Sequence, residues 1–475
     1  MGTALSVTGV AAASGQEERY STVVDMVDAG ADPEGNESVS SVVQEHIGDD
    51  TLLKFPEGEY YMDSQVRLTN FENVGIVGDN ATLVPANYDE FDGPQYRLFR
   101  LGTSNRPGRD LQFGGFTVDQ TASNTGIRVI SAEVEDGLSV RNVYIHGVHD
   151  SGTWGPGLFN ITDPDGSGHV YCFRAFDGGI HIDETPNDGR WRGATGIILN
   201  ENHRGQLTFE SCVLGGFPDN GLYASGSNGE IDVEGGWYEN SGTASIRLSG
   251  ARGSIKEAIA VVDENPEWVN GQHAIRLDRG DRYEIENVTV DAPNPNGEAV
   301  RIMRNVDATE ITNTRISVGE GNSSAVRIDS GTGAVDVENS EVEIDGDAYA
   351  FRILGEDDGT VELRDVDITG DADGSPIRHA IYCERNGCRF HGISVDQPGG
   401  NNRAALELFG DDYVIADSEF ETTHVPITVN GSDNVRVENN YSRSYEGRHS
   451  FQITDDSGSV SFENNDFPGG VRDFR

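Results

Sequence analysis

One tetrapeptide recurs along the chain at a step of about 25 to 30 residues, and this repeat constrains the fold more than any other feature. Steps of this size are typical of solenoids, in which each repeat forms one coil. Apolar residues flank a central arginine, so period-two alternation places the apolar side chains inside and the arginine outside. Stacked coils would therefore carry a column of arginines on one face. The copies are Ser245–Leu248, Ala274–Leu277, Ala299–Ile302, Ala325–Ile328, Ala350–Ile353 and the arginine-free Ala380–Cys383.

A second repeat lies half a step after the first and begins with Asn or Asp, followed three residues later by an apolar residue. Asparagine suits a tight corner, because its side chain hydrogen-bonds nearby backbone and tolerates a left-handed conformation. We expect these corners to stack in successive coils. They are Asn142, Asn287, Asn313, Asn339, Asp365 and Asn464.

Helical periodicity is almost absent after residue 50, while short strands and frequent glycines continue to the end. This combination predicts an all-β chain, a right-handed parallel β-helix (solenoid) with a short N-terminal helical cap. A solenoid grows by adding coils to one core, so its length does not imply several globular domains. We expect residues 20–475 to form a single domain.

The N-terminal part combines an Asp28–Asp32 turn, a short helical pattern over Val39–Ile47, a strand over Leu53–Tyr61 and a strand over Val74–Ala81. Together these segments resemble the N-terminal cap of the pectate-lyase-like right-handed β-helix superfamily. The resemblance covers roughly residues 20 to 85, and the turn Gly30-Ala31-Asp32 is shorter than the superfamily pattern. It implies the fold but not one activity, since the superfamily includes lyases, hydrolases, epimerases, phage tailspikes and inert surface proteins.

The charge is very negative, with 34 Lys and Arg against 81 Asp and Glu, a formal net charge of −47. Only Lys54 and Lys256 are lysines. An acidic, lysine-poor surface resembles proteins from extremely salty environments, so we expect a halophilic, haloarchaeal-type protein. Such a surface makes nucleic acid and anionic membranes improbable partners.

Residues 1–19 begin with an apolar stretch that is similar to part of an export signal without its basic start, and it is too short to span a membrane. We interpret these residues as the remnant of a signal whose true start lies upstream, followed by a disordered segment. The expected location is therefore secreted or at the cell surface. Cys383 and Cys388 could then form a small-loop disulfide, and Cys172 and Cys212 could stack in neighbouring coils; free buried thiols are the alternative for both pairs.

The stretch from residue 146 to 240 departs most from the repeat and concentrates side chains capable of acid–base chemistry. Asp177-Gly178-Gly179-Ile180-His181 and Asp219-Asn220-Gly221-Leu222-Tyr223 share one frame, which places His181 and Tyr223 on the face of Arg247. The candidate catalytic residues are Asp177, His181, Asp183, His203, Asp219 and Tyr223. The alternative is that Asp177 and Asp219 form turns and the aromatic residues cover loop edges.

Two kinds of cleavage are compatible with these residue types. A polysaccharide lyase needs a base and a cation that neutralises a uronate carboxylate. The residues of the right kinds for these roles are His181, His203, Tyr223, Arg204 and Arg247. A glycoside hydrolase needs two carboxyl groups about 5 to 9.5 Å apart, which neighbouring coils can supply. The fuller hydrolase motifs of β-helix glycosidases are missing from this sequence, so a lyase is preferred.

The arginine column has its own two interpretations. Neighbouring arginines about 5 Å apart repel by roughly 0.8 kcal/mol in water, so something must offset them. Asp278 and Asp329 could form a parallel acidic column; otherwise a uronate or sulfated glycan could lie along the coils. The candidate substrate-binding residues are Arg204, Arg247, Arg276, Arg301, Arg327 and Arg352.

Two acidic turns, Asp163–Gly168 and Asp371–Ser375, resemble half of a calcium loop but lack its distal glutamate. Calcium is therefore the only cofactor that the sequence suggests, and solvated turns are the simpler interpretation. The sequence leads to two functional hypotheses: an exported enzyme acting on an acidic extracellular polysaccharide, and a non-catalytic cell-surface, glycan-binding or virus-associated adhesin protein.

Overall fold

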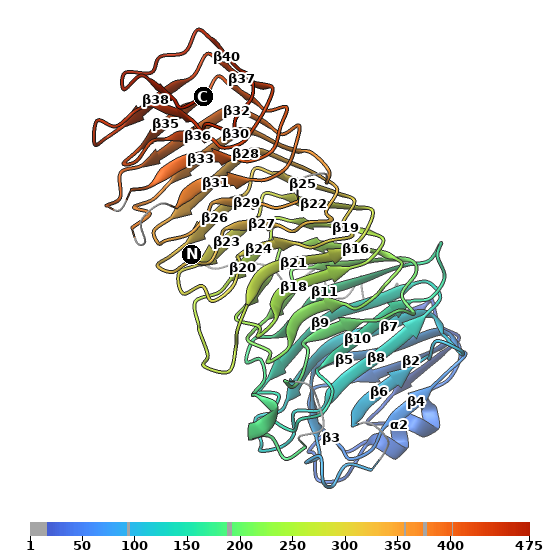
Figure 1. Ribbon diagram of the computed structural model, residues 1–475. Helices are drawn as coiled ribbons and strands as arrows, with labels where there is room; N and C mark the ends of the chain where they lie inside the picture. The colour runs from blue at the N-terminus through green and yellow to red at the C-terminus, as the bar shows by residue number, and fades with distance from the viewer. Residues whose placement is uncertain (1–16, 93–95, 188–191, 356–357, 374–377, 401) are drawn as a thin grey trace, which may run out of the picture. The chain divides into compact units, whose positions relative to one another are not determined.

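The computed structural model describes residues 17–92, 96–187, 192–355, 358–373, 378–400 and 402–475. The chain divides into two compact units, residues 1–219 with 225–230, and residues 220–224 with 231–475. Each unit is a parallel β-solenoid, and together the described strands form about 16 turns. The all-β parallel β-helix is thus confirmed, as the stacked arrows in Figure 1 show. The single domain over residues 20–475 stays a prediction, and the signal remnant lies largely outside the described residues.

Unit 1 pairs its strands in two parallel sheets and contains the only α-helix of the described chain, α2 (Ser40–His46). Its first sheet comprises β1 (Thr22–Asp25), β2 (Thr51–Phe55), β3 (Gly58–Met62), β5 (Glu72–Pro85), β7 (Arg109–Asp119), β9 (Leu138–His146), β11 (Ser167–Ala175), β13 (Gln206–Glu210) and β14 (Val213–Leu214). Its second sheet comprises β4 (Val66–Leu68), β6 (Arg97–Leu101), β8 (Arg128–Val134), β10 (Gly157–Ile161) and β12 (Ile197–Leu199). A 3₁₀ turn, η1 (Ile182–Glu184), lies in a loop between β11 and β12.

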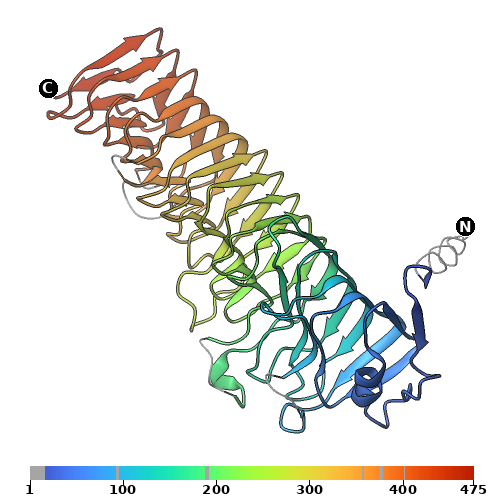
Figure 2. The same ribbon diagram turned by 90° about the vertical axis from the view of Figure 1, so that its right-hand side faces the viewer.

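The helix α2 caps the start of the second sheet, as predicted from residues 39–47. Gln44 uses both ends of its amide on one residue of β4: the Arg67 N–H donates to Gln44 Oε1 (2.7 Å), and Gln44 Nε2 donates to the Arg67 carbonyl (3.1 Å). Figure 2 shows this short helix beside the first strands of the unit. A covered edge cannot pair with another chain, so the cap protects the sheet.

Unit 2 repeats the same coil more regularly. Its first sheet comprises β16 (Glu230–Glu234), β17 (Trp237–Glu239), β19 (Arg252–Lys256), β20 (Ile259–Val261), β22 (Arg282–Glu286), β23 (Thr289–Ala292), β25 (Ala308–Thr312), β26 (Arg315–Val318), β28 (Ala334–Ile344), β30 (Val361–Thr369), β32 (Arg389–Gln397), β34 (Val414–Ala416), β35 (Glu419–Thr422), β37 (Val435–Glu438), β38 (Tyr441–Ser444) and β40 (Val460–Glu463). Its second sheet comprises β15 (Asn220–Ala224), β18 (Ala244–Ser249), β21 (His273–Arg279), β24 (Val300–Ile302), β27 (Val326–Ile328), β29 (Phe351–Ile353), β31 (His379–Cys383), β33 (Ala404–Leu408), β36 (Ile427–Val429), β39 (Phe451–Ile453) and β41 (Val471–Asp473).

The predicted tetrapeptide repeat is the second sheet of unit 2. Arg276 pairs with Arg247 on one side and Arg301 on the other, and the pairing continues without a shift through Arg327 and Arg352. The flanking residues point inward and are almost completely buried, each contributing roughly 1.5–3 kcal/mol through burial. These inward columns are Ile246, Ile275, Val300, Val326, Phe351 and Ile381, and Leu248, Leu277, Ile302, Ile328, Ile353 and Cys383.

The predicted corners are also confirmed. Asn142, Asn287, Asn313, Asn339, Asp365 and Asn464 all have a positive φ, between 50° and 55°. At such angles a side chain with a Cβ is normally strained, and Asn and Asp are the residues that adopt them most readily. The corner repeat in the sequence therefore reflects the need for a positive φ at these positions and is not a binding motif.

The four cysteines are buried free thiols, so the disulfide considered for Cys383 and Cys388 is not present. Cys172 and Cys212 lie on adjacent coils of unit 1, as expected, and burial raises the pKa of Cys212 to about 12. Among the described residues no helix is long and apolar enough to cross a membrane.

A buried arginine connects several coils of unit 2. Arg385 is 0% exposed, and its guanidinium donates to the carbonyls of Leu354 (2.9 Å), Gly333 (3.0 Å), Gly359 (2.7 Å) and Asp329 (2.9 Å). These acceptors precede it by up to 56 residues. One side chain thus donates to four carbonyls on preceding coils.

We expect Arg385→Met to lower the free energy of unfolding by at least about 3 kcal/mol, because methionine fills the space but cannot donate the four hydrogen bonds that Arg385 makes. Thermal unfolding followed by circular dichroism measures the change. Arg389→Met, at an exposed arginine that donates to the Gly387 carbonyl (3.0 Å), is the matched control. Equal melting temperatures for the two variants would contradict the role of Arg385.

Candidate functional site

The outer face of the second sheet of unit 2 carries the arginine column, and acidic residues hold four of its five arginines. Asp278 binds Arg247 (2.7 Å) and Arg276 (2.6 Å), and Asp329 binds Arg301 (2.9 Å) and Arg327 (2.6 Å). The two aspartates are only 17% and 13% exposed. The acidic column considered from the sequence is therefore present, and the like-charge repulsion along the column is offset within the protein.

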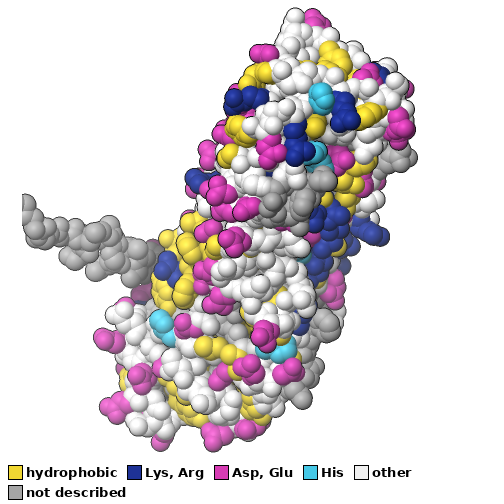
Figure 3. Space-filling model, turned by 60° about the vertical axis from the view of Figure 1, so that its left-hand side comes forward, with side chains coloured by type: hydrophobic (Ala, Val, Ile, Leu, Met, Phe, Trp, Pro, Cys, Tyr) yellow, Lys and Arg dark blue, Asp and Glu magenta, His cyan; other side chains and the backbone are white. Residues whose placement is uncertain are grey.

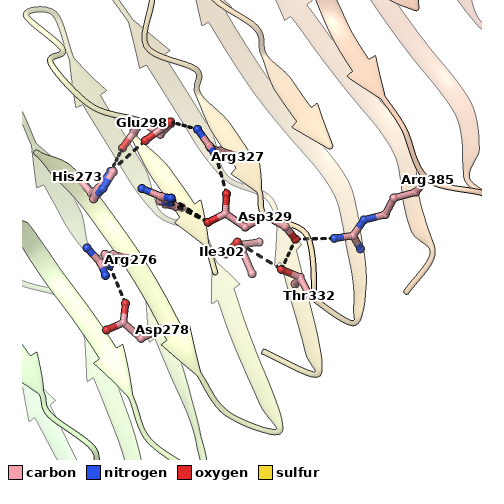
Figure 4. Close-up of polar contacts among 10 residues, drawn as sticks. His273, Arg276, Asp278, Glu298, Ile302, Arg327, Asp329, Thr332 and Arg385 are labelled. Atoms are coloured by element: carbon pink, nitrogen blue, oxygen red, sulfur yellow. Dashed lines mark hydrogen bonds and ion pairs between the residues drawn. The ribbon is translucent and has the colours of Figure 1, made fainter. Parts of the chain in front are cut away.

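The ion pairs extend into a network (Figure 4). Arg327 also contacts Glu298 (3.0 Å), and the Glu298 carbonyl accepts a hydrogen bond from His273 Nδ1 (2.8 Å). The Asp329 carbonyl accepts bonds from Thr332 Oγ1 (2.7 Å) and from Arg385. Asp329 thus joins the surface column, through its carboxylate, to the buried Arg385, through its backbone. Its position leaves the two arginines little freedom to reorient.

Arg352, the last arginine of the column, lies in a different environment. It makes no ion pair with any described carboxylate, and its guanidinium lies 5.7 Å from the ring centre of Tyr349. The Tyr349 ring is 5.6 Å from that of Tyr382, and the Tyr382 ring is 5.0 Å from that of Phe409. These partly exposed rings form an aromatic patch, which we define as Tyr349, Tyr382 and Phe409.

Polar groups border the aromatic patch. Arg378 donates to the Tyr349 hydroxyl (3.1 Å) and pairs with Asp347 (3.2 Å). Glu384 accepts from the Tyr382 hydroxyl (2.9 Å) and from the Gly355 N–H (3.2 Å). The patch therefore offers apolar ring surface next to fixed hydrogen-bonding groups, a combination common in ligand-binding sites.

At the other end of the column, Tyr223 of β15 pairs with Arg247 in register, as predicted, and its ring lies 4.3 Å from the Arg247 guanidinium. This is a cation–π contact. The column thus runs from Tyr223 through five arginines to Tyr382 and Glu407.

Several candidate catalytic residues in unit 1 hydrogen-bond to residues of its loops. Asp177 accepts from the Gly147 N–H (2.7 Å), and Asp219 accepts from Thr195 Oγ1 (2.7 Å). His181 is not a strand residue: it precedes η1, and its Nδ1 accepts from the Asp183 N–H (3.4 Å), while the Asp183 side chain is 82% exposed. Asp177 and Asp219 thus each bond to the preceding coil, and their catalytic role stays a prediction.

His203 has a structural role inside unit 1. It is fully buried: the Ile161 N–H donates to its Nδ1 (3.1 Å), and its Nε2 donates to the Glu230 carbonyl (3.2 Å). Burial lowers the pKa of His203 to about 4. Both ring nitrogens are engaged, so a role as the base of a lyase does not fit this geometry. The neighbouring Arg204 is exposed, and its backbone N–H donates to the Ile161 carbonyl (2.7 Å).

Unit 1 also contains a hollow of about 790 Å³, lined by Asp25, Lys54, Gly114, Gly115 and Arg141 among others. A Cβ on Gly114 would lie 1.9 Å from the Arg141 carbonyl oxygen, and one on Gly115 would lie 2.2 Å from that of Gly78. Close packing of backbones on adjacent coils therefore requires these glycines. The glycines alone do not indicate a ligand.

No group of three or more His, Cys, Asp or Glu side chains among the described residues is arranged to hold a metal ion. In the turn that resembles a calcium loop, Asp163 accepts from the Asp165 N–H (3.0 Å), as a simple turn does. The second such turn, Asp371–Ser375, lies partly outside the described residues.

No family model matches this chain, and no curated protein matches it by sequence. Among solved structures, the chain is similar to the following three, each at low sequence identity. A tailspike protein variant of E. coli bacteriophage HK620 is 10% identical over 95% of this chain and 80% of its own, with a TM-score of 0.48. The Streptococcus pneumoniae surface protein and adhesin PfbA is 12% identical over 94% and 97%, with a TM-score of 0.39.

The third structure, ORF18 of Geobacillus virus E2, is 9% identical over 80% of this chain, with a TM-score of 0.41, and the match covers 62% of the viral chain. At these identities, and with TM-scores below 0.5, the resemblances carry no argument about function. Membership of the pectate-lyase-like superfamily stays a prediction, as does the halophilic character.

We expect acid to destabilise the protein between about pH 6.5 and pH 4, partly through His203. Its folded pKa is below the ordinary value of 6.5, so the unfolded chain takes up the proton first. The stabilisation from neutral His203 is complete above pH 6.5, and roughly 3 kcal/mol is lost as the pH falls to 4. Melting temperatures across this range measure the loss.

His203→Gln tests this assignment, since glutamine does not titrate. The variant is expected to be less stable at pH 7 but to lose less stability on acidification than the wild type. His391→Gln, at a half-exposed histidine paired with Asp417 (3.0 Å), is the control. A pH dependence in His203→Gln as steep as that of the wild type would show that His203 is not a major contributor.

Proposed function

We propose that this protein binds an acidic extracellular polysaccharide along the outer face of the second sheet of unit 2. The observation that carries the proposal is the change at Arg352, where a regular acid-paired column meets the aromatic patch. Secretion or display at the cell surface is part of the same proposal. Binding is preferred to lyase activity because His203, one of the predicted bases, is buried with both ring nitrogens hydrogen-bonded.

The acid-paired arginines supply preorganised polar groups. Asp278 and Asp329 each hold two guanidinium groups, so these planar donors are already oriented before a ligand arrives. A fixed side chain loses less conformational entropy on binding than a free one. The column is therefore suited to hydrogen-bonding the hydroxyl groups of a chain that runs along the coils.

Arg352 supplies the preference for an acidic sugar. Because no described carboxylate pairs with it, a uronate carboxylate can form the charge-assisted hydrogen bonds that its neighbours make with aspartate. The rings of Tyr382 and Phe409 provide apolar surface for the sugar ring beside Arg352. A single sugar unit would contact both features.

The net charge of −47 opposes the approach of any polyanion. In molar salt the Debye length falls to roughly 3 Å, and only charges in contact still matter. The scattered acidic side chains in Figure 3, seen as magenta groups between a few dark-blue clusters, would then repel a ligand weakly. We therefore expect tighter binding as salt rises from low to molar concentration, contrary to the usual behaviour of ionic complexes.

Isothermal titration calorimetry with polygalacturonate, and with dextran as the neutral comparison, tests the proposal at low and molar salt. We expect Arg352→Gln to weaken polygalacturonate binding by roughly ten- to a hundredfold, the value of a charged hydrogen bond. Arg315→Gln, at a 61% exposed arginine of the first sheet, should bind like the wild type. Equal binding of dextran and polygalacturonate, or an unaffected Arg352→Gln, would refute the proposal.

A further inference from the structure

Two glutamates and two aromatic residues form a four-cornered cluster, here called the square, at the C-terminal ends of β31 and β33. Tyr382 pairs with Glu407 across the two strands, and the next residues, Cys383 and Leu408, pair in register. The Phe409 N–H donates to the Cys383 carbonyl (2.9 Å), so the parallel pairing continues and sets Glu384 beside Phe409. Tyr382 and Phe409 lie on one diagonal of the square, Glu384 and Glu407 on the other.

The dimensions of the square follow from parallel sheet geometry. Adjacent coils are about 4.8 Å apart, and two residues along a strand span about 6.6 Å. The Glu384 and Glu407 positions are therefore about 8 Å apart, with the contacting Tyr382 and Phe409 rings between them. Inverting glycoside hydrolases hold their two carboxyl groups about 6.5 to 9.5 Å apart, a separation that side chains from two positions about 8 Å apart can reach.

The two glutamates have different surroundings. Glu407 is 17% exposed and contacts His379 Nε2 (3.1 Å) and Asn430 Nδ2 (3.3 Å). Burial raises the pKa of Glu407, as suits a carboxylic acid that gives up a proton. Burial also lowers the pKa of His379 to about 3, so its imidazole stays neutral and places no positive charge beside Glu407.

Glu384, in contrast, has donors directed at both oxygens. The Tyr382 hydroxyl (2.9 Å) and the Gly355 N–H (3.2 Å) hydrogen-bond its carboxylate. Burial and the neighbouring Glu384 raise the pKa of Tyr382, so the phenol remains a donor. These two donors hold the Glu384 carboxylate in one orientation, as suits a group that accepts a proton from water.

We propose that Glu407 and Glu384 are the general acid and general base of an inverting glycoside hydrolase site on the aromatic patch. The proposal rests on the polysaccharide binding proposed above and adds cleavage of an O-glycosidic bond. The sugar ring lies over Tyr382 and Phe409, between the two carboxyl groups.

The reaction needs water as its only co-reactant. Glu407 donates its proton to the glycosidic oxygen as the bond from this oxygen to the anomeric carbon breaks. A water molecule on the opposite side of the ring attacks that carbon, and its proton passes to Glu384. The product is a free reducing end of inverted configuration, and exchange with solvent returns both carboxyl groups to their starting states.

The experiment uses the full chain with polygalacturonate, alginate and xylan, each with three readouts: new reducing ends, the anomer of the first product by proton NMR, and absorbance of unsaturated uronates. We expect reducing ends of inverted configuration and no absorbance. Glu407→Gln and Glu384→Gln should each slow release at least about a hundredfold, the usual effect of losing a general acid or base. Both should still bind the polysaccharide within about threefold of wild type.

Glu310→Gln is the matched control, since Glu310 pairs with Arg282 (2.6 Å) on the first sheet, away from the square. A wild type that binds polygalacturonate without releasing reducing ends from any of the three would overturn the catalytic assignment and leave the binding proposal intact. Absorbance of unsaturated uronates would overturn it in favour of β-elimination. A wild type that neither binds polygalacturonate nor releases reducing ends would refute both proposals.

Discussion

The parallel hydrogen-bond register between successive coils is the constraint on which the rest of this structure depends. Because the register does not shift from Arg276 to Arg352, every position of the repeat becomes a column on a face or in the core. The same register that buries the isoleucines also stacks identical charges on the surface. A chain that keeps this register must neutralise its columns, and it does so with aspartates two residues beyond alternate arginines, Asp278 and Asp329.

Buried polar groups stabilise the loops that the register leaves irregular. Arg385 donates to carbonyls of preceding coils, and His203 bridges Ile161 and Glu230 through both nitrogens. Such groups are costly to bury without partners and therefore hold their loops in one conformation. Within unit 2, Asp329 takes part in both kinds of contact. Its backbone carbonyl accepts a hydrogen bond from the buried Arg385, and its carboxylate orients Arg301 and Arg327.

Much of the fold could be predicted because it is periodic. The arginine register, the left-handed corners at Asn287 and Asn313, and the role of Asp278 all follow from local spacing. The aromatic patch could not be assembled in this way, since Tyr349, Tyr382 and Phe409 come from coils of unequal length and from different positions of the repeat. The missing arginine at Tyr382 was the one signal that pointed there. Arg385 gave no signal, because its acceptors precede it by 26 to 56 residues.

The arginine column has a further consequence for any chain that lies on it. The same unit of two arginines and one aspartate occurs twice along the column, so a ligand of matching repeat would have two positions of similar energy and could slide between them. The break at Arg352 and Tyr382 removes this degeneracy. A ligand that can shift along the repeated positions would therefore be held in a single register by the one position that differs.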